Sequence, residues 1–173
     1  MARFDIVGQL GSLRRYARSL TRDSADAEDL VHDALVRAYE RRGTFRSGGN
    51  LRAWLFSIVH NVFVDRMRSR RSEAARIEQA GYLADANAPA PQDHSVRLAE
   101  VREAFLALPD EQRSALHLVA IEGLSYAQAA EVIGVPLGTL MSRIGRARAA
   151  LREMEEGVRD RRKDHLRIVG GES

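Results

Sequence analysis

The stretch LSYAQAAEVIGVPLGTLMSRIGRARAAL, residues 124–151, predicts two short helices joined by a tight turn. Ser125 and Gln128 have the spacing of a capping box, in which each side chain binds the backbone N–H of the other residue. Gly134 can end the first helix in a left-handed conformation, and Pro136 can stand at the start of the second. The stretch therefore indicates a helix-turn-helix.

The second of these helices has an apolar side and an outward side lined by small and basic residues. Leu140, Ile144 and Ala147 recur at intervals of three or four, which is the stripe expected of a core-facing surface. A face with small residues can approach a major groove closely, so that flanking arginines reach phosphates or guanine edges. An ordinary surface helix with solvated arginines is the alternative. The candidate DNA-binding residues of this helix are Thr139, Met141, Ser142, Arg143, Arg146 and Arg148.

Charge is unevenly distributed along the 173 residues, although their formal net charge is only +3. Residues 41–72 contain eight arginines and one acid, and residues 132–152 contain four arginines and no acid. Residues 23–33, in contrast, contain five carboxylates. Basic segments attract phosphate backbones, whereas an acidic segment suits a basic partner. We therefore expect a nucleic acid and a second protein as partners.

Several classes of protein are not expected from this composition. The chain has no cysteine, which excludes disulfides and thiolate metal sites. Its five histidines are scattered without ligand spacing, so we expect no metal and no cofactor. No arrangement of a nucleophile with a histidine is apparent, and an enzyme is not expected. The sequence has no signal peptide and no apolar run long enough for membrane insertion, so we expect a cytoplasmic protein.

Helical periodicity dominates and no alternating strand pattern persists, which predicts an all-α fold. We expect two small helical domains joined by a flexible linker. The first domain is expected at residues 1–71 and the linker, which contains two of the four prolines, at 72–94. The second domain is expected at residues 95–155, and the tail at 156–173 is expected to fray.

The expected starts of three helices follow from capping residues. Asp23 or Ser24 can cap a helix that ends near Gly43, and Asn50 can cap the long helix that follows. Asp110 is expected to cap a helix in the second domain. The buried face expected for the long helix consists of Leu51, Trp54, Leu55, Ile58, Val62 and Phe63.

Two long segments resemble one family. DAEDLVHDALVRAYERRGTFRSGGNLRAWLFSIVHNVFVDRMRSRR, residues 26–71, resembles region 2 of bacterial sigma factors of the extracytoplasmic-function (ECF) group. LPDEQRSALHLVAIEGLSYAQAAEVIGVPLGTLMSRIGRARAAL, residues 108–151, resembles their region 4, and the two segments occur in the family's order. The resemblance implies two helical domains without catalytic activity. It implies a subunit that binds core RNA polymerase and directs it to promoters for transcription initiation.

The resemblance also implies three sets of site residues. The helix from Thr139 to Arg148 would read the −35 element, and the polymerase would be contacted through its β′ clamp and β flap. The residues implied for the clamp are Asp26, Glu28, Asp29, Leu30 and Asp33. The residues implied for the −10 element are Phe45, Arg46, Asn50, Asn61, Arg66, Arg68, Arg70 and Arg71.

Three of these residues have an alternative role. Met141 stands where many family members have lysine, so an apolar contact to a thymine methyl can replace a phosphate contact. Phe45 has the alternative of packing within its loop. Asp26 has the alternative of serving only the start of its helix.

The family is commonly controlled by anti-sigma proteins, and we expect such a partner here. Two alternatives belong to other classes: a sigma mimic that sequesters an anti-sigma factor without binding DNA, and a stand-alone helix-turn-helix regulator. A mimic should have lost the basic residues of the recognition helix and the −10 loop, which are present. A stand-alone regulator would need a dimerisation helix, and no spare apolar helix is apparent.

Overall fold

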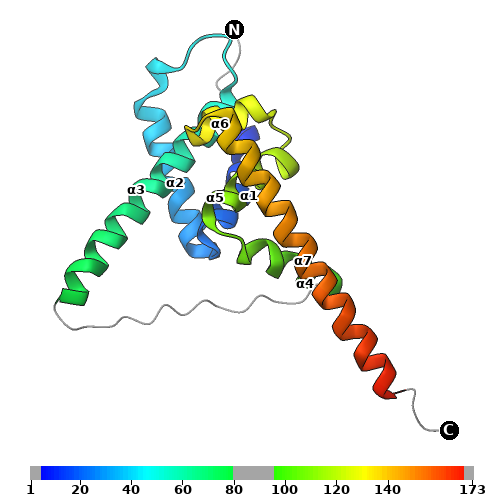
Figure 1. The fold of residues 1–173 in the computed structure, drawn as a ribbon. Coiled ribbons are helices and arrows are strands. Elements are labelled where there is room, and N and C mark those ends of the chain that lie inside the picture. The colour runs from blue at the N-terminus through cyan, green and yellow to red at the C-terminus, as the bar shows by residue number, and fades with distance from the viewer. Residues whose placement is uncertain (1–4, 80–95, 170–173) are drawn as a thin grey trace.

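The computed structural model describes residues 5–79 and 96–169, in which every regular element is helical (Figure 1). The elements of the first domain are η1 (Val7–Gln9), α1 (Leu10–Thr21), α2 (Ser24–Glu40), η2 (Arg42–Thr44) and α3 (Leu51–Gln79). The elements of the second domain are α4 (Val96–Ala107), α5 (Asp110–Leu116), the π-helix η3 (His117–Ile121), α6 (Tyr126–Ile133) and α7 (Leu137–Val169). The predicted all-α fold with two helical domains is confirmed.

Local capping explains where three of the helices begin. The carboxylate of Asp23 accepts a hydrogen bond from the backbone N–H of Asp26 at the start of α2 (2.9 Å). The side-chain oxygen of Asn50 accepts one from the backbone N–H of Ala53 at the start of α3 (3.0 Å). Both hydrogen bonds of the Ser125–Gln128 capping box are present at the start of α6. These predicted caps are confirmed, since each needs only a few neighbouring residues.

The turn of the helix-turn-helix also has the predicted geometry. Gly134 ends α6 with φ +76°, a left-handed conformation that a residue without a Cβ adopts at little cost. Its N–H donates to the carbonyl of Ala130 (2.9 Å), which satisfies the end of α6. Leu137 then begins α7 directly after Pro136.

Asp110 does not cap α5, contrary to the sequence prediction. Pro109 occupies the N-cap position, and the carboxylate of Asp110 accepts a hydrogen bond from the Arg113 guanidinium instead (2.6 Å). A cationic donor one turn away binds a carboxylate more strongly than a neutral backbone N–H does. Asp110 therefore orients Arg113 rather than starting the helix.

The ends of α3 and α7 extend further than the sequence indicated. Helix α3 continues to Gln79, and the rest of the predicted linker lies outside the described residues. The tail expected to fray from residue 156 is helical as far as Val169, with an ion pair between Arg159 and Glu155 one turn apart (2.7 Å). In Figure 1 the C-terminal halves of α3 and α7 project in different directions from the packed centre.

The two domains share one hydrophobic core. Leu13, Leu30 and Leu55 of the first domain belong to the same buried cluster as Leu118 and Leu140 of the second. Helix α3 packs against α6, and α1 packs against α5. The packing of the two domains on each other places their candidate sites close together.

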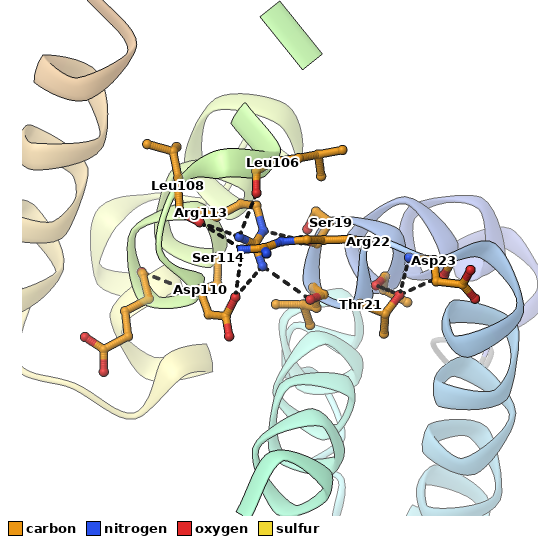
Figure 2. Close-up of polar contacts among 12 residues, drawn as sticks. Ser19, Thr21, Arg22, Asp23, Leu106, Leu108, Asp110, Arg113 and Ser114 are labelled. Atoms are coloured by element: carbon orange, nitrogen blue, oxygen red, sulfur yellow. Dashed lines mark hydrogen bonds and ion pairs between the residues drawn. The ribbon is translucent and has the colours of Figure 1, made fainter. Parts of the chain in front are cut away.

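A buried arginine links the domains at the end of α1 (Figure 2). The side chain of Arg113, on α5, is 0% exposed. Its guanidinium donates to the backbone carbonyls of Ser19 and Leu20 in the first domain. It also donates to the carbonyl of Leu108 and to Asp110 in its own domain. One side chain therefore satisfies the ends of helices in both domains.

A second charged cluster lies at the boundary, around Glu122. Its side chain is 0% exposed and accepts hydrogen bonds from Arg15 of α1 (3.1 and 3.2 Å) and Arg52 of α3 (2.5 Å). The Nε2 of His117 lies 3.1 Å from the same carboxylate. Burial alone raises the pKa of Glu122, but the two arginines outweigh it and the pKa is lowered. Glu122 is therefore an ionised carboxylate held between the domains.

Candidate nucleic-acid interface

The recognition helix presents the face that the sequence predicted. Leu140, Ile144 and Ala147 are 0%, 2% and 0% exposed, so the apolar stripe of α7 is buried against the second domain. The opposite face is open to solvent. The exposed candidate residues on it are Thr139, Met141, Ser142, Arg146 and Arg148.

Arg143 differs from the other candidates on α7. Its side chain is 18% exposed and forms an ion pair with Glu111 of α5 (3.2 Å). The sequence analysis expected it to reach a phosphate or a guanine edge from the flank of the outward face. In this conformation it reaches toward α5 and the first domain. Burial, and then the charge of Arg143, lower the pKa of His60 on α3 to about 4.

The loop between α2 and α3 holds the first candidates for the −10 element. The rings of Phe45 and Trp54 lie 5.4 Å apart between centroids, and both residues are half-buried. The loop-packing alternative for Phe45 therefore describes its position in this structure. Arg46 is exposed. Asn50 is also exposed, and its side-chain oxygen is occupied by the cap of α3.

The candidates on α3 form two groups, one whose side chains form no ion pair within the described residues and one whose side chains are paired with α2. Asn61, Arg68 and Arg71 are exposed. Arg66 donates to the carboxylate of Asp33 (2.5 Å), and to the backbone carbonyl of Asp29 (3.2 Å). Arg70 likewise pairs with Asp26 of α2 (3.4 Å). Two arginines expected to hold phosphates are thus paired with residues expected to bind polymerase.

The residues of α2 predicted to bind the polymerase clamp are at least partly exposed, except Leu30. Glu28, Asp29 and Asp33 are exposed, and Asp26 is half-buried beside Arg70. Leu30 is 0% exposed because it belongs to the core of the first domain. Leu30 therefore supports α2 from within in this structure and offers no surface to a partner.

A cavity of about 350 Å³ joins the two sets of DNA-binding candidates. Arg68 and Arg71 of α3 line it from the first domain, and Arg143 of α7 lines it from the second. Sequence reasoning treated these residues as parts of two separate sites. The structure brings them together because α3 and α6 are packed against each other.

The described residues contain no group of three or more histidine, aspartate or glutamate side chains that could hold a metal ion. Across residues 5–79 and 96–169, no helix is long and apolar enough to cross a membrane.

The fold and the exposed face of α7 define a helical DNA-binding protein, and comparison with known proteins specifies its class. Residues 8–73 match the family described as Sigma-70 region 2, and residues 98–151 match Sigma-70, region 4. The chain is similar to the ECF RNA polymerase sigma factor EcfG of Rhodopseudomonas palustris. The two are 39% identical over 86% of this chain and 82% of that protein.

Two solved structures are also similar to this chain. One is the sigma factor RpoE in complex with the anti-sigma factor NepR from Bartonella quintana, with a TM-score of 0.73 and 34% identity over 88% of this chain and 94% of that one. The other is CnrH in complex with the cytosolic domain of CnrY, with a TM-score of 0.63 and 32% identity over 88% and 85% of the two chains.

The chain belongs to the ECF RNA polymerase sigma factors. The predicted family is therefore confirmed, and so is the predicted function of promoter recognition and transcription initiation.

Sequence reasoning missed the charged residues at the domain boundary. They are Arg15, Arg52, Arg113, His117 and Glu122. The partners of Arg15 and Arg113 across the boundary lie 107 and 94 residues away in the chain. Periodicity compares residues a few positions apart, so it carries no signal for such pairs.

Proposed function

We propose how the two domains divide promoter recognition between them. The second domain places the N-terminal half of α7 in the major groove of the −35 element, as helix-turn-helix proteins do. The first domain docks on the polymerase clamp through the acids of α2. Its 43–50 loop and α3 then hold an unpaired −10 strand. The observation that supports this division best is the exposed, small and basic face of α7 opposite its buried stripe.

We propose an anti-sigma factor as a further partner. Two similar proteins were solved with partners: the sigma factor RpoE with the anti-sigma factor NepR, and CnrH with the cytosolic domain of CnrY. In this chain, Val96, Leu98 and Val101 of α4 are 71%, 56% and 57% exposed. They line a cavity of about 950 Å³ that also includes Arg15 and Arg18 of α1. An amphipathic helix with an acidic edge fits this chemistry.

This role requires no reaction at the chain itself. The catalytic chemistry belongs to the polymerase, and the sigma factor contributes binding and orientation. We place its action in the cytoplasm, where polymerase and chromosome meet.

Reconstitution with core RNA polymerase tests the function directly. Transcription in vitro from a library of promoter sequences should show initiation that depends on this chain and on two sequence elements near −35 and −10. Absence of initiation from any promoter would overturn the proposal. Binding to an anti-sigma factor without initiation would favour the sigma mimic instead.

A double substitution tests the assignment of the −35 surface. Arg143→Ala with Arg146→Ala should reduce initiation at a −35-dependent promoter by about 30-fold or more, since two good base contacts of about 1–3 kcal/mol each are lost. Binding to core polymerase should be unchanged. Arg152→Ala, an exposed arginine further along α7, is the matched control. Loss of polymerase binding in the double variant would show that the roles of the domains are misassigned.

A further inference from the structure

The outward side of the recognition helix α7 presents an exposed methionine. The side chain of Met141 is 51% exposed, and that of Leu137, one turn before it, is 47% exposed. Because they are four residues apart, the two side chains lie on the same side of the helix. Neither belongs to the buried hydrophobic cluster, to which α7 contributes Leu140, Ile144 and Ala147. Leu137 and Met141 therefore form an apolar edge of α7 that lies outside the core.

The two sides of the outward face differ in chemistry. At about 100° per residue, Met141 lies on one side of Gly138 and Gly145, and Ser142 and Arg146 lie on the other. Ser142 and Arg146 line one cavity of about 440 Å³. Their side chains have hydrogen-bond donors for phosphates and for base acceptors, whereas the thioether of Met141 has neither a charge nor a donor. One side of the face is therefore suited to polar groups of DNA, and the other to an apolar group.

The glycines between these two sides leave room for the edge of a base pair. Gly138 and Gly145 are exposed, and a Cβ placed at either of them would meet no neighbouring side chain within 4 Å. A major groove admits an α-helix, and a helix with such a surface can lie deep in it. The N-terminal residues of a recognition helix are those that contact base edges. Met141 lies in the second turn of α7, so it is within this part of the helix.

The major groove offers one kind of apolar group to such a side chain. The base edges present hydrogen-bond donors and acceptors there, and thymine adds its C5-methyl group. Removal of one methyl or methylene group from water contributes about fourfold to an affinity. The unbranched methionine side chain adapts to irregular surfaces, so it can follow the methyl group without a fixed geometry. Thymine is therefore the base whose edge matches Met141.

We propose that Met141 selects thymine within the −35 element by contact with its 5-methyl group, and that Leu137 supports this contact from the preceding turn. Ser142 and Arg146 bind polar groups on the other side of the helix. The recognition helix thus distinguishes base pairs by two independent kinds of contact. The inference rests on the proposed function, because it requires that α7 enters the major groove of the −35 element.

Replacement of single thymines by deoxyuridine tests this contact, because uracil pairs with adenine as thymine does and lacks only the 5-methyl group. The full chain is reconstituted with core RNA polymerase on a promoter selected from the transcription library. Each thymine on either strand of the −35 element is then replaced in turn. At one or two positions, the replacement should reduce initiation about fourfold when the polymerase is below saturation.

Substitutions at Met141 connect the methyl group to this side chain. Met141→Ala should lower initiation from the thymine promoter about fourfold and abolish the difference between thymine and uracil. Met141→Leu keeps a long apolar side chain and should keep the difference. Met154→Ala, at a half-buried methionine further along α7, is the matched control and should leave the ratio of the two templates unchanged. Arg146→Ala should lower initiation from both templates and also leave their ratio unchanged.

Three results would overturn the inference. The first is a set of selected promoters without an A·T pair in the −35 element, and the second is equal initiation from thymine and uracil at every position. The third is a Met141→Ala variant that initiates less but keeps the wild-type ratio of the two templates, as expected if Met141 contacts a protein instead of DNA. Failure of the proposed function is distinguishable, because initiation would then be absent from every promoter. Circular dichroism shows whether the variants keep their helices.

Discussion

The two domains differ in whether their candidate DNA-binding arginines form ion pairs. In the first domain, Arg66 and Arg70 pair with acids of α2. In the second, Arg146 and Arg148 are exposed, and within the described residues neither forms an ion pair. The comparison indicates that, in the first domain, two of the candidate DNA-binding arginines and two of the candidate polymerase-binding acids neutralise each other, while the candidate recognition helix keeps most of its charge available.

The largest expected effect is the loss of stability when the buried arginine Arg113 is replaced. Arg113→Met removes the donor to four backbone carbonyls and to Asp110, and the lost interactions lie in a site closed to water. We expect the free energy of unfolding to fall by about 3–5 kcal/mol. Urea denaturation measures this change.

Arg152→Met is the control for this stability measurement, because the side chain is exposed on α7. It should change the free energy of unfolding by less than about 0.5 kcal/mol. Equal losses in the two variants would show that Arg113 has no special structural role.

Acidification should lower the free energy of unfolding. Burial, and then the charge of Arg143, lower the pKa of His60 to about 4, and burial also lowers the pKa of His117, so the folded chain favours the neutral imidazoles. Between pH 6.5 and 4, unfolded molecules bind more protons at His60 than folded molecules do. The free energy of unfolding should therefore fall as pH falls through this range, by up to about 1.4 kcal/mol per pH unit at His60.

The groups around His60 determine the control for this pH prediction. Tyr16 contacts it within the first domain (2.9 Å), and Arg143, Asp110 and Glu111 line the cavity beside it from the second. His60→Gln should reduce the pH dependence of the free energy of unfolding, measured by urea denaturation between pH 7.5 and 5.5. A wild-type free energy of unfolding that is constant over this range would contradict the prediction.

The smallest expected effect concerns the pairing inside the first domain. Asp33→Asn releases Arg66 from an exposed ion pair, a change of at most about 1 kcal/mol. The free chain should bind a single-stranded oligonucleotide up to about fivefold more tightly at low salt, as measured by fluorescence anisotropy. Its salt dependence should steepen by about 0.7 in log–log slope if one phosphate contact is gained.

Glu155→Gln makes the same change of charge on α7, where Glu155 pairs with Arg159 (2.7 Å). This variant should alter the affinity less than Asp33→Asn does. Equal gains would show that net charge, rather than the release of Arg66, accounts for the tighter binding.

The parts of the fold that could be predicted are those that neighbouring residues determine. The caps at Asp23 and Asn50, the capping box at Ser125 and the buried stripe of α7 all depend on spacings of a few residues. The same is true of the exposed face of the recognition helix. Each of these features was visible in the sequence without knowledge of the remainder of the chain.

Burial at the domain boundary could not be predicted in this way. Phe56 and Val59 are both 0% exposed, although the predicted stripe of α3 omitted them. Helix α3 is covered by α1 and α2 on one side and by α6 on another, so its buried surface is wider than one amphipathic stripe. Arginine and glutamate are usually solvent-exposed, so no pattern of neighbouring residues marks Arg113 and Glu122 as buried, and their burial depends on distant partners.

If polymerase binds the two domains only after they separate, the core that they share makes this sigma factor a weaker competitor for polymerase than its binding surfaces alone would allow. A protein that is binding-competent for a fraction f of the time has an apparent Kd raised by 1/f. A packed arrangement of the domains favoured by about a hundredfold would thus raise the apparent Kd for core polymerase about a hundredfold. At low concentrations of the chain, other sigma factors would then occupy most of the polymerase, and promoter output would rise only above a threshold concentration of the chain.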